Sequence, residues 1–141
     1  MTILSESIIF NFPLDTLTLS DLLAFKGESV TLEYVLQEFI VGNREYALHL
    51  LVKNGKIVKD ICIEYHFTHD YPIKNKDTPT ARCIIEEPFL DTWQPLLELI
   101  NFEGICCINY KIKNGQPKLL EINPRIGGSL CEYLFSFVGK L

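Results

Sequence analysis

The sequence has no run of basic residues, and its acidic side chains outnumber the basic ones. It contains 13 Lys and Arg against 18 Asp and Glu, which gives a formal net charge of −5 at pH 7. This balance argues against nucleic acid and anionic membrane surfaces as main partners, because both are polyanions. It remains compatible with a local cationic site for a phosphate group.

Long hydrophobic runs are also missing. No apolar run approaches the length that crosses a bilayer, so we expect no membrane partner. The N-terminal stretch MTILSESIIFNFPLD has neither the basic region nor the apolar core of a signal peptide. The five cysteines are odd in number and lack Cys-x-x-Cys spacing, so no zinc site is predicted. Most lie in apolar segments, which favours buried, reduced thiols in a cytoplasmic protein.

The residues that are present suit one globular domain. A chain of 141 residues can form a single core, and 48% of its residues are hydrophobic. Lys-Asn-Gly occurs twice, each time between apolar runs, and Asn-Gly in that setting is a strong β-hairpin signal. We therefore expect two hairpins, formed by residues 45–52 with 56–67 and by residues 104–112 with 117–123.

The other elements follow from pattern and capping chemistry. We expect a strand over 31–42 that closes at Gly42, a polar loop over 69–80, a strand over 81–87, a helix over 91–101 capped by Asp91 or Thr92, and an apolar helix over 129–138 capped by Ser129. Strands joined by hairpins, with helices between them, predict an α+β fold with an antiparallel sheet.

The stretch LLEINPRIGGS, residues 119–129, combines unusual chemistry. Glu121, Asn123 and Arg125 alternate with apolar neighbours, so on a strand their side chains point to one face until the bend at Pro124. A carboxylate and an amide oxygen at this spacing can share one hard cation such as Mg²⁺. Arg125 can then bind a phosphate or carboxylate with its planar fork. The following Gly127-Gly128 pair lets backbone N–H groups approach a ligand closely.

Asn109 lies on the preceding hairpin strand, and the turn decides its face. A three-residue loop with a bulge would place Asn109 on the face of Glu121. A two-residue loop would place it on the opposite face, and Gly115 fits either loop.

Plain structural interpretations exist for each of these residues. An isolated Glu-x-Asn-x-Arg is commonly a solvated strand face with an Arg–Glu ion pair, and Gly-Gly after a strand is commonly a turn. His49 fits a strand pattern and is predicted to be packed, and the sequence offers no Ser–His–Asp or Cys–His arrangement. The combination of an apolar hairpin, Glu-x-Asn-Pro-Arg and Gly-Gly-Ser favours a functional site.

Two segments resemble a known family. FEGICCINYKIKNGQPKLLEINPRIGGSL, residues 102–130, resembles the C-terminal core of ATP-grasp enzymes, most closely the carbamoyl-phosphate-synthetase-like and carboxylate–amine ligase members. LQEFIVGNREYALHLLVKNGKIV, residues 36–58, resembles the family segment that carries the adenine and the ribose-binding acid. The resemblance implies an α+β fold with an antiparallel sheet and flanking helices, the C-terminal half of an ATP-grasp fold. It assigns residues 34–141 to that subdomain and leaves 1–33 as an N-terminal segment of unclear assignment.

The resemblance also implies roles for individual residues. Glu121 and Asn123 match the Mg²⁺ (or Mn²⁺) ligands, and Asn109 falls at the position of a further ligand. Arg125 matches the arginine that contacts phosphate or the acyl phosphate. The remaining matches are Glu45 for the ribose hydroxyls, Glu38, Phe39 and Ile40 for the adenine edge, and Gly127, Gly128 and Ser129 for the loop near the acceptor substrate.

The implied function is the ATP- and Mg-binding part of a ligase that activates a carboxylate as an acyl phosphate for attack by an amine. The family's N-terminal lobe has no match here, so we expect the chain to be inactive alone and to need a partner chain or a homo-oligomer. The alternative is a non-catalytic module of the same fold that acts through protein association. A third interpretation is an unrelated α+β protein. Glu45 could also pair with Arg44, and Phe39 and Ile40 could be core residues.

Overall fold

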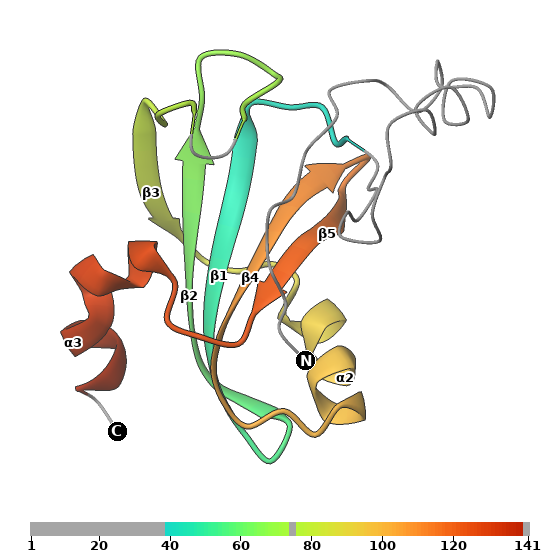
Figure 1. Cartoon of the computed structure of the whole chain (residues 1–141). Helices are drawn as coiled ribbons and strands as arrows, with labels where there is room; N and C mark the ends of the chain where they lie inside the picture. Colours follow the sequence, from blue (N-terminus) through green and yellow to red (C-terminus); the bar gives the residue numbers. More distant parts are fainter. Residues whose placement is uncertain (1–38, 74–75, 140–141) are drawn as a thin grey trace, which may run out of the picture. The chain divides into compact units, whose positions relative to one another are not determined.

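The structure is a computed structural model that describes residues 39–73 and 76–139. The chain divides into two compact units, Met1–Val41 and Gly42–Leu141, and each is considered by itself. All helices and strands below belong to the second unit (Figure 1). They are β1 (Arg44–Lys53), β2 (Lys56–His66), β3 (Ala81–Ile85), α2 (Leu90–Leu99), β4 (Gly104–Lys113), β5 (Gln116–Asn123), the 3-10 helix η3 (Gly128–Tyr133) and α3 (Leu134–Val138).

The strands form one sheet in the order β3-β2-β1-β4-β5, and every neighbouring pair is antiparallel. The predicted α+β fold with an antiparallel sheet is therefore confirmed. The strand expected over 31–42 falls mostly on residues 31–38, outside the described part. Its described end, residues 39–42, is irregular and not a strand, so that part of the prediction is wrong. None of the helices in the described ranges has the length and hydrophobicity of a transmembrane span.

Both predicted hairpins form, and each closes with a two-residue Asn-Gly turn. Asn54 and Gly55 have φ of 52° and 74°, and Asn114 and Gly115 have φ of 55° and 73°. Positive φ at both central residues is the geometry that matches the twist of the flanking strands, and asparagine and glycine reach it most easily.

One face of the sheet carries the hydrophobic core. It consists of alternate residues of the central strands, namely Tyr46, Leu48, Leu50, Val52, Cys62, Cys106, Ile108 and Tyr110, together with Trp93 and Leu97 of α2. The helix α2 covers this face, but its N-terminus differs from the prediction. Phe89 occupies the N-cap position, and neither Asp91 nor Thr92 caps the helix. The carboxylate of Glu87 accepts the Phe89 N–H at 2.9 Å, so it satisfies a backbone donor at the start of the helix.

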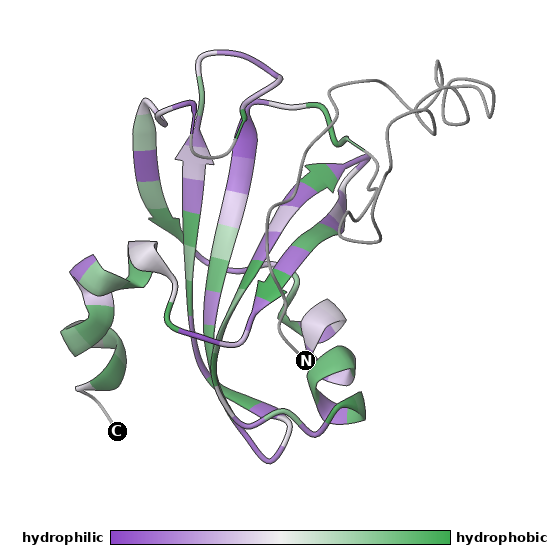
Figure 2. Ribbon diagram, in the orientation of Figure 1, coloured by the Kyte–Doolittle hydropathy of each residue, from purple (hydrophilic) through white to green (hydrophobic). Residues whose placement is uncertain are grey.

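The other face of the sheet is partly covered by the C-terminal segment. One α-helix was expected over 129–138, but the chain forms η3 and then a short α3. Ser129 does not cap the segment, since its hydroxyl is hydrogen-bonded to His49 at 2.8 Å. Lys59 Nζ donates to the Phe137 carbonyl at 3.0 Å and ties α3 to β2. Figure 2 shows that α3 is predominantly hydrophobic.

The cysteines follow the prediction in part. Cys62, Cys106 and Cys107 are buried, whereas Cys83 and Cys131 are exposed. Burial raises the pKa of the Cys106 thiol to about 11, so this sulfur stays protonated and unreactive at neutral pH.

Candidate functional site

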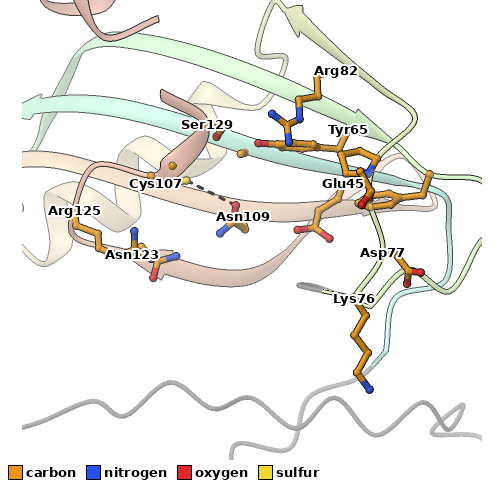
Figure 3. Close-up of a pocket in the computed structure, with 16 residues that line it drawn as sticks. Glu45, Tyr65, Lys76, Asp77, Arg82, Cys107, Asn109, Asn123, Arg125 and Ser129 are labelled. Carbon is orange, nitrogen blue, oxygen red and sulfur yellow. Dashed lines mark hydrogen bonds between the residues drawn. The ribbon is translucent and has the colours of Figure 1, made fainter. Parts of the chain in front are cut away.

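A pocket of about 430 Å³ opens on the sheet face opposite α2 (Figure 3). It is lined by Glu45, Ala47, Tyr65, Phe67, Lys76, Asp77, Thr78, Pro79, Arg82, Cys107, Asn109, Asn123, Arg125, Gly127, Gly128 and Ser129. The pocket thus brings together seven of the predicted site residues: Glu45, Asn109, Asn123, Arg125, Gly127, Gly128 and Ser129.

The strands β1, β4 and β5 supply the floor of the pocket through period-two alternation. Ala47 pairs with Asn109, and Asn109 pairs with Glu121, so these residues share one face. The turn at Asn114-Gly115 has two residues, which alone would put Asn109 and Glu121 on opposite faces. A register shift between Asn109 and Tyr110 removes the conflict, because Leu120 is an extra residue on β5 between Leu119, opposite Tyr110, and Glu121, opposite Asn109. This bulge restores the shared face.

Asn109 and Glu121 are joined directly. The Asn109 Nδ2 donates to Glu121 Oε1 at 2.7 Å, and the Cys107 thiol approaches Asn109 Oδ1 at 3.7 Å. A carboxylate can only accept, so the amide nitrogen must face Glu121 and the amide oxygen must face Cys107. Asn109 therefore orients Glu121, and its own oxygen is turned away from that carboxylate.

The donor set fits a magnesium ion that is shared with a ligand. Glu121 and Asn123 offer a carboxylate and an amide oxygen at i and i+2 on one strand face. Among residues 39–73 and 76–139, no group of three His, Cys, Asp or Glu side chains could hold a metal. Mg²⁺ commonly uses one or two carboxylates and completes its shell with water and substrate phosphates. Glu121 and Asn123 suit that arrangement, whereas an all-protein cage does not fit.

Cationic side chains lie along the pocket. Arg125 is exposed, and its Nη1 donates to the Ile126 carbonyl at 3.2 Å. Arg82 stacks over the Tyr65 ring at 5.4 Å, and in Figure 3 Arg125 and Lys76 lie at opposite ends of the view. Burial raises the pKa of Tyr65, so its hydroxyl stays neutral. Positive charges of this kind can bind a phosphate or carboxylate group.

His49 is a site residue whose role the sequence did not reveal. Its ring is fully buried, Nε2 is hydrogen-bonded to Ser129 Oγ, and buried Nδ1 has no hydrogen-bond partner. Burial lowers the pKa of His49 to about 4, so the imidazole is neutral at pH 7. A Cβ built on Gly127 would lie 2.5 Å from His49 Cε1. Gly127 therefore permits close packing on the ring, and His49 in turn holds Ser129.

Lys111 was also missed by sequence reasoning. It follows Cys107 and Asn109 on the same face of β4, yet its side chain is buried. Its Nζ donates to the Gly42 carbonyl at 2.7 Å. Burial lowers the pKa of Lys111, while the charges of Glu45 and Asp70 act in the opposite direction. Strand alternation from Asn109 could have indicated this residue.

The other predicted residues are placed as follows. Glu121 lies beside the pocket and is not among its lining residues. Arg44 forms an ion pair with Glu64 at 3.2 Å, on the face opposite Glu45. Glu38 lies outside the described residues. Phe39 and Ile40 belong to the unit that ends at Val41, so their roles remain predictions.

Comparison with known proteins gives structural matches only. No family model and no curated protein matches the sequence. The chain is similar to D-alanine–D-alanine ligase from Bacillus anthracis complexed with ATP, with 21% identity and a TM-score of 0.42, over 62% of this chain and 30% of the ligase. A second structure of this ligase gives 18% identity and a TM-score of 0.44, over 67% and 33%. D-alanine–D-alanine ligase is an ATP-grasp enzyme, the family that the sequence resembles. The chain thus spans about a third of these ligases.

Proposed function

We propose that this chain is the nucleotide- and magnesium-binding part of an ATP-grasp ligase, which activates a carboxylate as an acyl phosphate for attack by an amine. The observation that carries the proposal is that one pocket gathers Glu45, Asn123 and Arg125. The sequence resemblance assigns these three residues to ribose, metal and phosphate. Asn123 and Arg125 belong to one short motif, but Glu45 lies far away in the sequence, on β1, and a chance match to that motif would not bring Glu45 into the same pocket.

The nucleotide would lie along the sheet face between Glu45 and Arg125. Glu45 offers a carboxylate to ribose hydroxyls, and Lys111 on the neighbouring strand holds the backbone at Gly42, just before β1. Arg82 and Lys76 add positive charge to the pocket. A pocket that combines apolar surface with polar groups and cations is suited to a phosphorylated ligand.

The chemistry needs positioning and charge neutralisation more than a side-chain nucleophile. Glu121 and Asn123 would hold Mg²⁺, which supplies charge stabilisation to the phosphates when bound. Asn109 keeps the Glu121 carboxylate in place through its 2.7 Å hydrogen bond. Arg125 would contact the transferred phosphoryl group, and the Gly127–Ser129 loop would lie near the acceptor. His49 is buried and neutral, so it acts as a support for that loop.

Calorimetric titration with Mg-ATP tests the proposal. We expect saturable binding by the chain, and binding at least about tenfold weaker for Glu121→Gln, since an amide replaces the anionic oxygen ligand. Glu103→Gln is the matched control, because it makes the same change at an exposed residue outside the pocket. Absence of heat with the unaltered chain would overturn the nucleotide site.

A second function is favoured by exposed hydrophobic side chains. Phe135 of α3 is 90% exposed and Leu99 at the end of α2 is 83% exposed. Such side chains suit a non-catalytic module that works through association with other proteins. That function predicts no nucleotide effect and a stable oligomer in light scattering.

A further inference from the structure

The strand β3 is an open edge of the sheet. Within the described ranges it pairs only with β2, and all its residues except Ile85 are exposed. Ile84 is 54% exposed, and it lies on the same face of the sheet as Arg82. An edge strand with exposed apolar residues is a template for another strand.

The direction of the free backbone groups on β3 follows from the β1–β2 ladder. The Phe67 N–H donates to the Asn43 carbonyl, so the backbone groups of Phe67 point toward β1. Along β2 from there, the backbone N–H and C=O groups of successive residues point alternately toward β3 and toward β1. The backbone groups of Glu64 point toward β3, where Glu64 pairs with Cys83, so the backbone groups of Cys83 point toward β2. Arg82 and Ile84 therefore direct their N–H and C=O groups away from the sheet, and the exposed Glu86 directly follows the end of β3.

The sequence of this edge is complementary to itself in antiparallel register. If Ile84 lies opposite Ile84 of a second copy, Arg82 of each copy lies opposite Glu86 of the other. Arg82 and Ile84 present outward backbone groups on β3, and Glu86 would do the same once pairing extends the strand by one residue, so the ladder hydrogen bonds can form. The pairing places apolar side chains at the centre and one opposite-charge pair on each side, and such cross-strand pairs are favourable.

The other edge of the sheet lacks these properties. The strand β5 contains Pro117, which has no N–H to donate, and the bulge at Leu120. Both features protect an edge against pairing. The segment 81–87 has no proline, and β3 pairs with β2 without a register shift.

We propose that two copies of the chain associate through their β3 strands, antiparallel about a twofold axis at Ile84, into one continuous sheet. This inference does not rest on the nucleotide site, but Arg82 also lines that pocket, so Glu86→Arg is the variant that leaves the pocket lining unchanged. A symmetric contact of this kind closes on itself, so it gives a dimer and no longer assembly. Arg82 also approaches Glu132 at 3.9 Å, and its guanidinium has enough donors to serve both carboxylates.

Sedimentation of the full chain over a range of concentrations tests the dimer. Arg82→Glu or Glu86→Arg places like charges opposite each other on both sides of the axis, and we expect about tenfold weaker association. The double variant Arg82→Glu with Glu86→Arg restores the opposite charges and should recover most of the affinity. Lys118→Glu, on the β5 edge, should leave association unchanged.

Three outcomes would overturn the proposal. The first is an unaltered chain that stays monomeric at all concentrations, as a protected edge would. The second is a dimer that the single charge reversals do not weaken. The third is a double variant that associates no better than the single ones. Circular dichroism checks folding, and Ile84→Lys, at an exposed position on the axis, replaces any variant that fails to fold.

Discussion

Substitution of Gly127 by alanine tests the packing that positions the loop at Gly127–Ser129. A Cβ at residue 127 would lie 2.5 Å from His49 Cε1 and 3.1 Å from Cys107 Sγ. Carbon atoms pack best at about 3.5–4.0 Å, so the ring or the loop must move by about 1 Å. His49 is fully buried and hydrogen-bonded to Ser129, which leaves it little room to turn.

The backbone at Gly127 adds no strain of its own. Its φ of −74° and ψ of 148° are open to any residue, so the cost comes from overpacking alone. Overpacking of a filled site costs about 1–3 kcal/mol, and we expect Gly127→Ala to lower the free energy of unfolding by this amount. If the loop moves instead of the ring, Ser129 shifts and ligand binding weakens as well.

Urea denaturation of Gly127→Ala and Gly128→Ala measures the effect. A Cβ on Gly128 would meet no atom within 4 Å, so that variant should differ by less than about 0.5 kcal/mol. His49→Ala in the Gly127→Ala background removes the obstructing ring, and the two changes should be strongly non-additive. Equal stability of Gly127→Ala and the unaltered chain would refute the role given to His49.

Three further predictions concern pH and backbone strain. The pKa of His49 falls from 6.5 in the unfolded chain to about 4 in the folded one. The free energy of unfolding should therefore decrease as the pH drops from 6.5 to 4, by at most about 3 kcal/mol. His49→Gln should lack this pH dependence when unfolding is measured over the same range. Gly55→Ala should destabilise the chain by about 1 kcal/mol more than Gly115→Ala in thermal unfolding. Both glycines have φ near +70°, but only a Cβ on Gly55 would meet the backbone of α2, at 3.0 Å. Asn109→Asp should place a second carboxylate beside that of Glu121 and raise the pKa of one of the two. The free energy of unfolding should then decrease as the pH rises above about 4–5. Mg²⁺ should reverse this loss in a denaturation assay.

The hairpins could be predicted because their signal is local. Asn-Gly selects positive φ within two residues, and both turns occur where the sequence places them. The face shared by Asn109 and Glu121 could not be settled in the same way. It depends on the bulge at Leu120, and no residue type there marks a bulge. The packing of the whole sheet decides such an irregularity.

The C-terminal segment shows why the helix prediction over 129–138 was incomplete. Its apolar pattern indicates a helix, but the start of a helix depends on an available cap. The Ser129 hydroxyl is instead bonded to His49, which is 80 residues away in the sequence. Long-range partners of this kind also explain Lys111, since the carbonyl that accepts from it belongs to Gly42.

The bulge at Leu120 divides the β4–β5 hairpin into two parts that have different registers. Between the turn and Tyr110 the strands follow the register set by Asn114-Gly115, and beyond Asn109 they follow a register displaced by one residue. The turn end is therefore free to vary in sequence for stability, while the far end keeps its polar side chains aimed at the pocket. If Leu120 were paired in a regular ladder instead, Asn109 would lie opposite Leu120, and Glu121 would point to the other side of the sheet with every turn residue unchanged. The bulge thus lets a tight two-residue turn and a polar site coexist on one hairpin, although the two features need different registers.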